Sequence, residues 1–201
     1  MRSHMKQYIS IYRKALRRKG FKDLDEKIQS YTFKYLELGI SDEYDKMSEY
    51  PSVDLEKIYA VVTMCLELKD YGFENDEILE MINDAFRRHK RFFFCIERII
   101  DLFPCTWKLV KDWNHKDHEK RMANGSIRYD FYNETEDQIS YRINKCIYVE
   151  IFEQYGIRDL CKIFCMADTQ AYSHLKRHVK FVRHSDLCEG DCCHDEVIRR
   201  K

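Results

Sequence analysis

The sequence predicts an α+β fold in which a helical N-terminal half packs on a C-terminal four-stranded antiparallel sheet with helices on one face. From residue 6 to about residue 113, apolar residues recur at intervals of three and four, which is the spacing of amphipathic helices. From residue 127 onward, short alternating segments separated by turn residues indicate strands. Because 201 residues suit one domain, we expect one integrated domain with a helical region at 5–118 and an α+β region at 125–201.

Four apolar stripes define the main helices expected in the N-terminal region. Residues that commonly end or begin helices flank them, with Gly39 and Gly72 after the second and third stripes and Asn75 before the fourth. A dense apolar segment stopped by Pro104 then leads into a short helix that ends near Trp113. The four stripes cover residues 8–16, 24–38, 55–66 and 78–86.

The character of the sequence changes at residues 114–125, which are polar and end in the turn signal Asn124-Gly125. We therefore expect a loop there, with His115 and His118 solvated within it. The strands and helices expected beyond it are a β-hairpin at 127–143, a helix at 146–155, one or two short helices at 160–175, and a second pair of strands at 179–183 and 192–198.

Charge and hydropathy restrict the partners. Lys+Arg and Asp+Glu are equal at 35 each, so no net charge attracts nucleic acid or an anionic membrane. The basic-aromatic run at 87–94 is interpreted as a helical turn beside a buried aromatic cluster.

No apolar run approaches the length of a membrane span. Residues 1–4 resemble a cloning scar. We expect a cytoplasmic protein with a small-molecule substrate, no nucleic-acid or membrane partner, and aromatic helix faces that favour a homo-oligomer.

Nine cysteines, an odd number concentrated late in the chain, argue against a disulfide framework and for reduced thiols, some of them reactive or metal-binding. Free cysteine is also among the most buried residue types, which is the simplest interpretation of any single one. We assign three of them to the core on that ground, namely Cys65, Cys95 and Cys105.

Two segments of the C-terminal region place chemically capable side chains together. Cys161 and Cys165 are four residues apart on an expected helix, and Asp168 follows one turn later, so all three share a face. In the last strand, Cys193 and Asp195 point to one side. Their sequence neighbours Cys192, His194 and Glu196 point to the other side, and only one set can face the helix.

Two chemical interpretations of these residues stay open. In the first, Cys165 or Cys193 is a thiolate nucleophile activated by His184 and Asp168, without a cofactor. In the second, a zinc ion is bound, although the short C-x2-C spacing of common zinc sites is missing. The candidate zinc ligands are Cys161, Cys165, Cys188, Cys192 and His194.

The order of motifs in the C-terminal half resembles the L-2-amino-thiazoline-4-carboxylic acid hydrolase family. The resemblance covers about residues 127–198 and includes a Cys-x-Tyr that opens a helix, an aromatic-rich turn into Gly, a Cys-x-x-Asp on the next helix and a late Gly before Cys. These motifs are Cys146-Ile147-Tyr148, Phe152-Glu153-Gln154-Tyr155-Gly156, Phe164-Cys165-Met166-Ala167-Asp168 and Glu189-Gly190-Asp191-Cys192-Cys193.

The resemblance implies hydrolytic opening of a small cyclic amidine, in which a thiazoline ring becomes an N-carbamoyl-cysteine. It places Cys146, Cys165, Asp168 and Cys193 in the site. Substrate-binding roles fall to Cys146, to Tyr148, to the backbone near Gly190, and to Asp195. Where the family pattern has Cys-Asp-Phe, this chain has Cys193-His194-Asp195, so an acid replaces an aromatic residue.

The function expected from the sequence is therefore a cysteine-dependent hydrolase that opens a cyclic amidine, a lactam or a related C–N or C–S bond. The alternative is a non-catalytic small-molecule or zinc-binding module that uses the late Cys and His residues.

Overall fold

The computed structural model describes the backbone of residues 3–200 and the side chains of residues 5–200. Of the expected cloning scar at 1–4, Met1 and Arg2 lie outside the described residues, and Ser3 and His4 are described only as backbone at the start of the first helix. The chain forms two compact units, one made of the segment up to His89 with Ile151–Ile163, and the other of Lys90–Glu150 with the segment from Phe164 onward.

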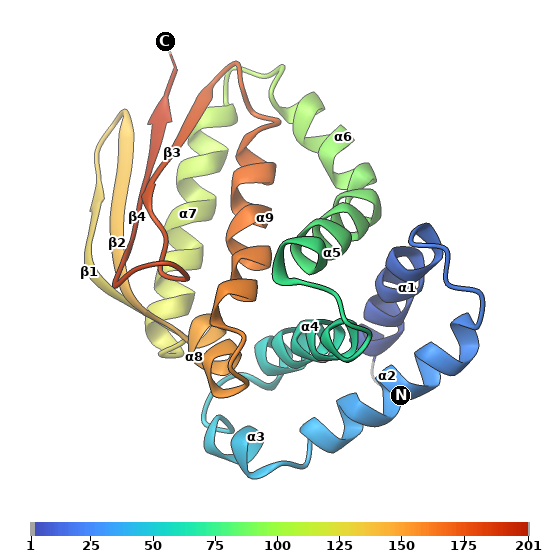
Figure 1. The fold of residues 1–201 in the computed structure, drawn as a ribbon. Helices are drawn as coiled ribbons and strands as arrows, with labels where there is room; N and C mark the ends of the chain where they lie inside the picture. The colour runs from blue at the N-terminus through green and yellow to red at the C-terminus, as the bar shows by residue number, and fades with distance from the viewer. Residues whose placement is uncertain (1–2, 201) are drawn as a thin grey trace. The chain divides into compact units, whose positions relative to one another are not determined.

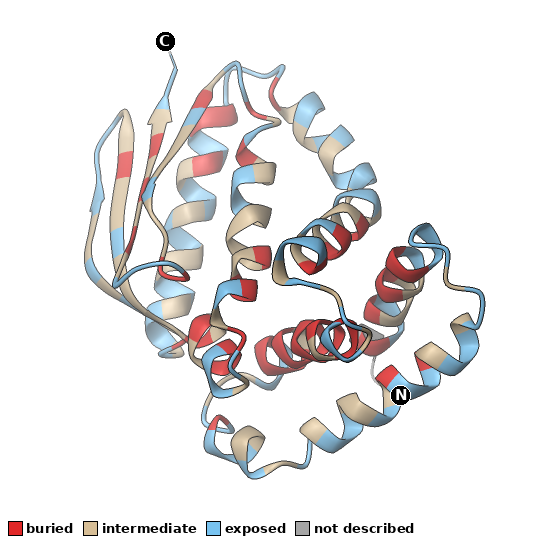
Figure 2. Ribbon diagram, viewed as in Figure 1, coloured by how far each residue is buried: buried red, intermediate tan, exposed pale blue. Residues whose placement is uncertain are grey.

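The first unit is helical, as the apolar stripes predict. Its central helix α4 is buried along most of its length (Figure 2), and Tyr31 of the second helix reaches it through a hydrogen bond from its hydroxyl to the carbonyl of Ala60 at 3.2 Å. Tyr12 packs on Tyr31 with ring centroids 5.0 Å apart. The unit contains α1 (Ser3–Arg18), α2 (Leu24–Leu38), α3 (Asp42–Lys46), α4 (Ser52–Asp70), α5 (Asn75–His89) and the short 3₁₀ helix η1 (Arg158–Cys161).

The second unit contains the predicted antiparallel sheet, in the strand order β1-β2-β4-β3. The last strand, β4, therefore lies between the hairpin and β3 and pairs with both neighbours. Helices α7 and α9 lie on the same face of this sheet (Figure 1). The elements are α6 (Arg91–Ile100), α7 (Thr106–Ala123), β1 (Ile127–Glu134), β2 (Gln138–Cys146), β3 (Val179–Ser185) and β4 (Cys193–Arg199). Two helices run from one unit into the other, α8 (Ile147–Gln154) and α9 (Lys162–Tyr172).

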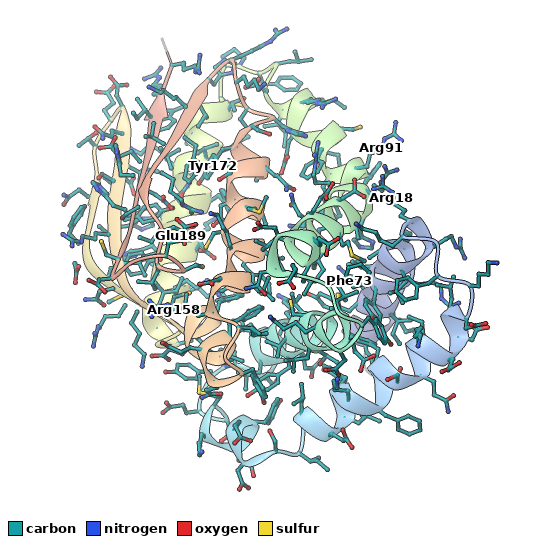
Figure 3. All side chains as sticks on the ribbon, in the orientation of Figure 1. Arg18, Phe73, Arg91, Arg158, Tyr172 and Glu189 are labelled. Atoms are coloured by element: carbon teal, nitrogen blue, oxygen red, sulfur yellow. The ribbon has the colours of Figure 1, made fainter. Side chains whose placement is uncertain are left out.

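The core of the second unit joins the helices to the inner face of the sheet. Val197 of β4 lies opposite Ile139 of β2, and both are fully buried. Tyr172, at the end of α9 (Figure 3), stacks on Phe181 of β3 with ring centroids 4.7 Å apart. The indole Nε1 of Trp107 in α7 donates to the carbonyl of Glu136 at 2.7 Å. This core fixes which face of each strand is turned inward.

The expected loop at 114–125 is wrong, because α7 continues to Ala123. Only its beginning carries buried apolar side chains, so the later turns show no apolar stripe in the sequence. Ion pairs four residues apart support those turns, including Arg121 with Asp117 at 3.4 Å. His118 is not solvated in a loop either, since its ring stacks on Tyr132 of β1 with centroids 3.9 Å apart.

Two further expectations about apolar residues need correction. Cys65 is fully buried as predicted, whereas Cys95 and Cys105 are exposed. Phe92 and Phe93 are 72% and 60% exposed, so they do not belong to a buried aromatic cluster. The basic-aromatic run is divided, because α5 ends at His89 and α6 begins at Arg91. The exposed rings on α6 are compatible with the homo-oligomer expected from the sequence, which stays a prediction.

None of the helices within residues 3–200 combines the length and the apolar character that a bilayer span needs.

Candidate functional site

The candidate site is built on an ion pair at the inner face of the sheet. Arg183 of β3 lies opposite Asp195 of β4 in the strand register. Its Nε donates to Oδ1 of Asp195 at 2.8 Å and its Nη2 donates to Oδ2 at 2.7 Å, which is the bidentate geometry that guanidinium and carboxylate groups favour. The Asp195 side chain is only 1% exposed. A carboxylate so deeply buried needs this compensation to stay charged.

Two more donors complete the surroundings of Asp195. The Tyr141 hydroxyl donates to Oδ2 at 3.1 Å, and the Cys193 thiol donates to the same oxygen at 3.5 Å. Tyr141 lies opposite Asp195 across β2 and β4. Burial, together with the neighbouring Asp195 carboxylate, raises the pKa of Tyr141 well above its ordinary value. Tyr141 therefore stays a hydrogen-bond donor at neutral pH.

Arg183 also connects the sheet to α9 and to the loop after β3. Its Nη1 donates to the carbonyl of Cys165 at 2.9 Å, and its Nη2 lies 3.6 Å from Oδ2 of Asp168. Its Nη1 is 3.9 Å from Oδ2 of Asp186. Burial lowers the pKa of Arg183, but the hydrogen bonds and charge of Asp195 outweigh it and raise that pKa. One permanent cation thus faces three carboxylates.

Asp168 is the most accessible carboxylate of the three, with 56% of its side chain exposed. The protein atoms that surround it still remove enough hydration to raise its pKa to about 6, against the opposing effect of Arg183. A carboxyl group with this pKa is present in both protonation states near neutral pH. Asp168 is therefore suited to give and take a proton.

The thiols of the site are protonated at neutral pH. Burial and the Asp195 carboxylate raise the pKa of Cys193, and the hydrogen bond with Cys188, together with burial, raises the pKa of Cys165. Burial raises the pKa of Cys146, at the end of β2, to about 12. A thiolate at any of these positions must therefore form by transfer of its proton to a partner.

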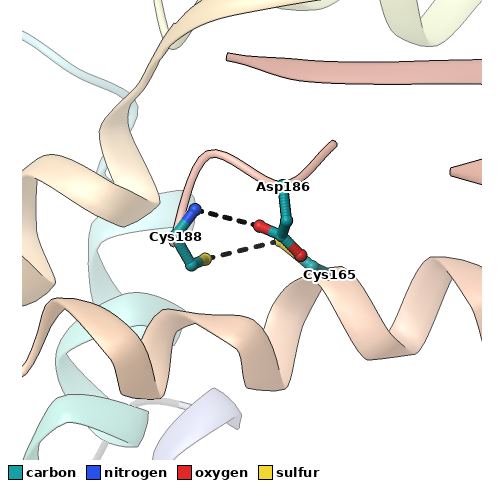
Figure 4. A group of neighbouring side chains, drawn as sticks. All are labelled: Cys165, Asp186 and Cys188. Carbon is teal, nitrogen blue, oxygen red and sulfur yellow. Dashed lines mark hydrogen bonds between the residues drawn. The ribbon is translucent and has the colours of Figure 1, made fainter. Parts of the chain in front are cut away.

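A second group of side chains lies where α9 meets the loop after β3. The Sγ atoms of Cys165 and Cys188 are 3.7 Å apart, and the carboxylate of Asp186 lies beside them (Figure 4). Oδ1 of Asp186 accepts a hydrogen bond from the backbone N–H of Cys188 at 2.9 Å. The carbonyl of Asp186 accepts one from the N–H of Gly190, also at 2.9 Å. These bonds shape the loop that holds Cys188 against α9.

His184 is not brought to the cysteines, contrary to the sequence prediction. It follows the inward-facing Arg183, so the alternation of a strand turns it to the opposite face. There its Nε2 lies 3.0 Å from Oε2 of Glu196, and its ring lies 4.8 Å from that of His194. A register shift between Arg183 and Ser185 accompanies this arrangement. The inner face accordingly has no histidine contribution from β3.

The alternative zinc set that the sequence left open is also not brought together as a whole. Cys165 and Cys188 are neighbours, but His194 lies on the outer face of the sheet with His184. The thiol of Cys192 lies 3.6 Å from Oγ of Ser185. Cys161 is part of η1 in the first unit. Asp186, which the prediction did not include, takes the place beside the two neighbouring thiols.

Tyr148, a predicted substrate-binding residue, has structural partners. Its ring packs on Phe164 with centroids 4.7 Å apart, and its hydroxyl accepts a hydrogen bond from Nη1 of Arg121 at 3.4 Å. Gly190 belongs to the loop between β3 and β4 and has ordinary van der Waals room for a Cβ, with the nearest backbone oxygen 3.6 Å away. Close backbone packing therefore does not require glycine at this position.

Sequence reasoning found Cys193, Asp195 and Asp168 but missed Arg183 and Tyr141. A signal for Arg183 does exist, because it shares one face of the strand with the apolar Val179 and Phe181. A cation at an inward position of a strand needs a buried partner. Tyr141 carries no comparable signal, since tyrosine is common in strands and its partner is set only by the register.

Comparison with known protein families shows the family to which the chain belongs. The model of the L-2-amino-thiazoline-4-carboxylic acid hydrolase family matches residues 55–195. This match extends well beyond the 127–198 of the sequence resemblance and includes α4 to α7, where the sequence offered no motif. No match is found among curated proteins. Because the family model covers most of the chain, including all of the residues around Arg183, the protein belongs to the L-2-amino-thiazoline-4-carboxylic acid hydrolase family.

Proposed function

We propose that the protein is a hydrolase that opens a small cyclic amidine, or a related C–N or C–S bond, at the cluster around Arg183. One observation carries the proposal. In a chain of this family, a thiol and a proton-exchanging carboxyl are both connected to the same partly buried guanidinium, through Asp195 for Cys193 and directly for Asp168. Such a group of nucleophile, base and acid is what the hydrolysis of a ring amidine requires.

Cys193 is the better nucleophile of the two cysteines that the sequence left open. Its thiol already donates to a carboxylate, Asp195, which can accept the proton when sulfur attacks. The thiol of Cys165 instead faces that of Cys188. Arg183 and Tyr141 hold the Asp195 carboxylate in place from the other sides, so its orientation toward Cys193 is preset.

Asp168 supplies the proton that the leaving group needs. In the proposed reaction, Sγ of Cys193 bonds to the ring carbon between sulfur and nitrogen, and the thiol proton passes to Asp195. The ring C–S bond then breaks, and the departing sulfur takes the proton of Asp168. Water adds to the carbon bound to Cys193, and its two protons go to the former ring nitrogen and to Sγ, which releases the thiol and leaves a carbamoyl product. Proton exchange with solvent then returns Asp195 to the carboxylate and Asp168 to the acid.

The acid that replaces an aromatic residue in the family pattern fits this scheme. Asp195 is paired with Arg183 at 2.7 and 2.8 Å, so it adds no net charge to the inner face. The exposed Asp168 is then the group that a small ligand meets first. An exposed carboxyl at this position suits a small substrate that carries a basic amidine group.

The test is a turnover assay with L-2-amino-thiazoline-4-carboxylate, simple cyclic amidines and lactams, using catalytic amounts of protein. For the thiazoline, product formation is followed as release of a new thiol. We expect Cys193→Ala to lower kcat/KM by about 100-fold or more, because the attacking atom is removed. The matched control is Cys192→Ala, which removes the adjacent thiol outside the cluster.

Unchanged turnover in Cys193→Ala would refute nucleophilic attack by this thiol while leaving the hydrolase in place. Absence of turnover by the unaltered protein on all three substrate classes would refute the proposed function itself. A covalent adduct on Cys193, detected by mass spectrometry after rapid acid quenching, would support the scheme independently of rates.

A further inference from the structure

Three potential ligand atoms converge at the junction of α9 and the loop after β3. They are Sγ of Cys165, Sγ of Cys188 and a carboxylate oxygen of Asp186, and all lie within 4.8 Å of one another (Figure 4). The two sulfur atoms are 3.7 Å apart. Two thiolates bound at about 2.3 Å to a tetrahedral zinc stand about 3.8 Å apart. The observed distance between the two sulfur atoms therefore matches that of two thiolates bound to one cation.

The surroundings keep these atoms in place. Cys165 is held by its helix, and its carbonyl is bonded to Arg183. Asp186 has a side chain only 11% exposed, and it accepts the N–H of Cys188 through Oδ1. Its other oxygen, Oδ2, faces Arg183 at 3.9 Å. The ligand atoms are thus positioned by backbone contacts rather than by long flexible side chains.

Charge also suits a divalent cation. Two thiolates and one carboxylate carry three negative charges, of which a divalent cation balances two, and Arg183, which Asp186 shares with Asp195, offsets part of the third. Two sulfur donors and one oxygen donor favour a thiophilic metal over magnesium or calcium, which take oxygen ligands.

We propose that Cys165, Asp186 and Cys188 form a binding site for a thiophilic divalent cation such as zinc, with a fourth position open to water. This inference is independent of the proposed hydrolase scheme, because the cation site uses Cys165 and the scheme uses Cys193. It differs from the alternative zinc set that the sequence left open, because it is smaller and includes Asp186.

The experiment titrates untagged, fully reduced protein with cadmium, which substitutes for zinc and gives a thiolate-to-cadmium charge-transfer absorbance in the ultraviolet. We expect this absorbance to saturate at one cadmium per chain, with release of about two protons as the thiols ionise. Cys165→Ser and Cys188→Ser should each weaken cadmium binding by about 100-fold or more, because loss of a ligand exceeds the ~10–100-fold cost of an outer-shell change. Asp186→Asn keeps the Oδ1 acceptor and should weaken it less.

The matched control is Cys192→Ser, in the same loop, which should retain the absorbance and the affinity. Circular dichroism of each variant shows whether it is folded, and Asp186→Asn still tests the site if a serine variant fails to fold. Cadmium bound without charge-transfer absorbance, or bound equally well by Cys165→Ser and Cys188→Ser, would overturn the proposal. Binding lost only in His184→Ala would place the cation on the outer face instead and would also overturn it. The outcome is separate from that of the turnover assay, since cadmium binding does not require Cys193.

Discussion

At the scale of single residues, the ion pair between the partly buried Arg183 and the buried Asp195 organises the candidate site. The same carboxylate that neutralises the guanidinium also accepts the thiol of Cys193. Structural and proposed catalytic roles therefore meet in one side chain. Substitutions of Asp195 will affect stability and activity together, whereas substitutions of Cys193 can separate the two.

The ion pair gives a prediction for stability. Arg183→Ala leaves the carboxylate of Asp195 buried without its cation, and we expect the free energy of unfolding to fall by about 3–5 kcal/mol. Urea unfolding measures this change in the free energy of unfolding. The double variant Arg183→Met with Asp195→Leu removes both charges and should be more stable than Arg183→Ala. A double variant as unstable as the single one would show that the loss comes from packing rather than from the unpaired charge.

A second prediction concerns pH. Loss of hydration to the surrounding protein atoms raises the pKa of Asp168 to about 6, and the charged groups that act on it are Arg183, Asp195, Lys90 and Asp117. As a general acid Asp168 must be protonated, so kcat should fall as the pH rises through about 6. In Asp168→Asn that descending limb should disappear, and the remaining rate should be lower by about 100-fold or more.

The same shift has a consequence for stability with a definite sign. The folded state binds the Asp168 proton more tightly than the unfolded chain, whose carboxyl titrates near 3.8. The contribution of Asp168 to the free energy of unfolding therefore falls as the pH rises from about 4 to about 6.

For the rate prediction, a wild-type kcat that stays constant across pH 6, together with full activity of Asp168→Asn, would contradict the assignment of Asp168 as the acid.

How far the sequence determines the site is clearest at this scale. Alternation along the last strand correctly places Cys193 and Asp195 on a common, buried face. The same alternation, applied to β3, would have excluded His184 as a partner once Arg183 was recognised as inward. What the sequence lacks is the register of β4 with its two neighbours, because β2 is distant in the sequence and the loop between β3 and β4 is longer than a tight hairpin turn.

At the scale of elements, α7 shows why a polar sequence can still form a helix. Its beginning is anchored by Trp107, and its later turns depend on ion pairs and on the contact between His118 and Tyr132. Periodicity methods detect only an apolar stripe. The helix past Trp113 was therefore invisible in the pattern, although its residues have good helix propensity.

A third stability prediction tests that anchor. Trp107→Phe keeps an aromatic ring in the core but removes the hydrogen bond from Nε1 to the carbonyl of Glu136. We expect a loss of about 1–3 kcal/mol in the free energy of unfolding. The carbonyl of Glu136 loses its hydrogen-bond donor, and the smaller ring leaves space unfilled in the core. Thermal or urea unfolding measures it, with Trp113→Phe on the exposed side of α7 as the control. An equal effect in both variants would argue against a specific anchoring role.

At the scale of the whole molecule, the fold class followed from two periodicities in the sequence, and both were confirmed. The helical stripes became α1, α2, α4 and α5, and the alternating segments became the sheet. The family relationship also extends further toward the N-terminus than motifs alone indicated. Helical packing residues carry little motif signal, since many apolar side chains satisfy the same position.

The alternation of β4 has a further consequence, for variation within the family. Its odd positions, Cys193, Asp195 and Val197, face the core and the proposed chemistry, while His194 and Glu196 face outward. The inward and the outward positions of this strand are thus subject to separate structural constraints. Substitutions on the outer side therefore leave the contacts of the inner side in place, so adjacent positions of the same strand can change independently of one another.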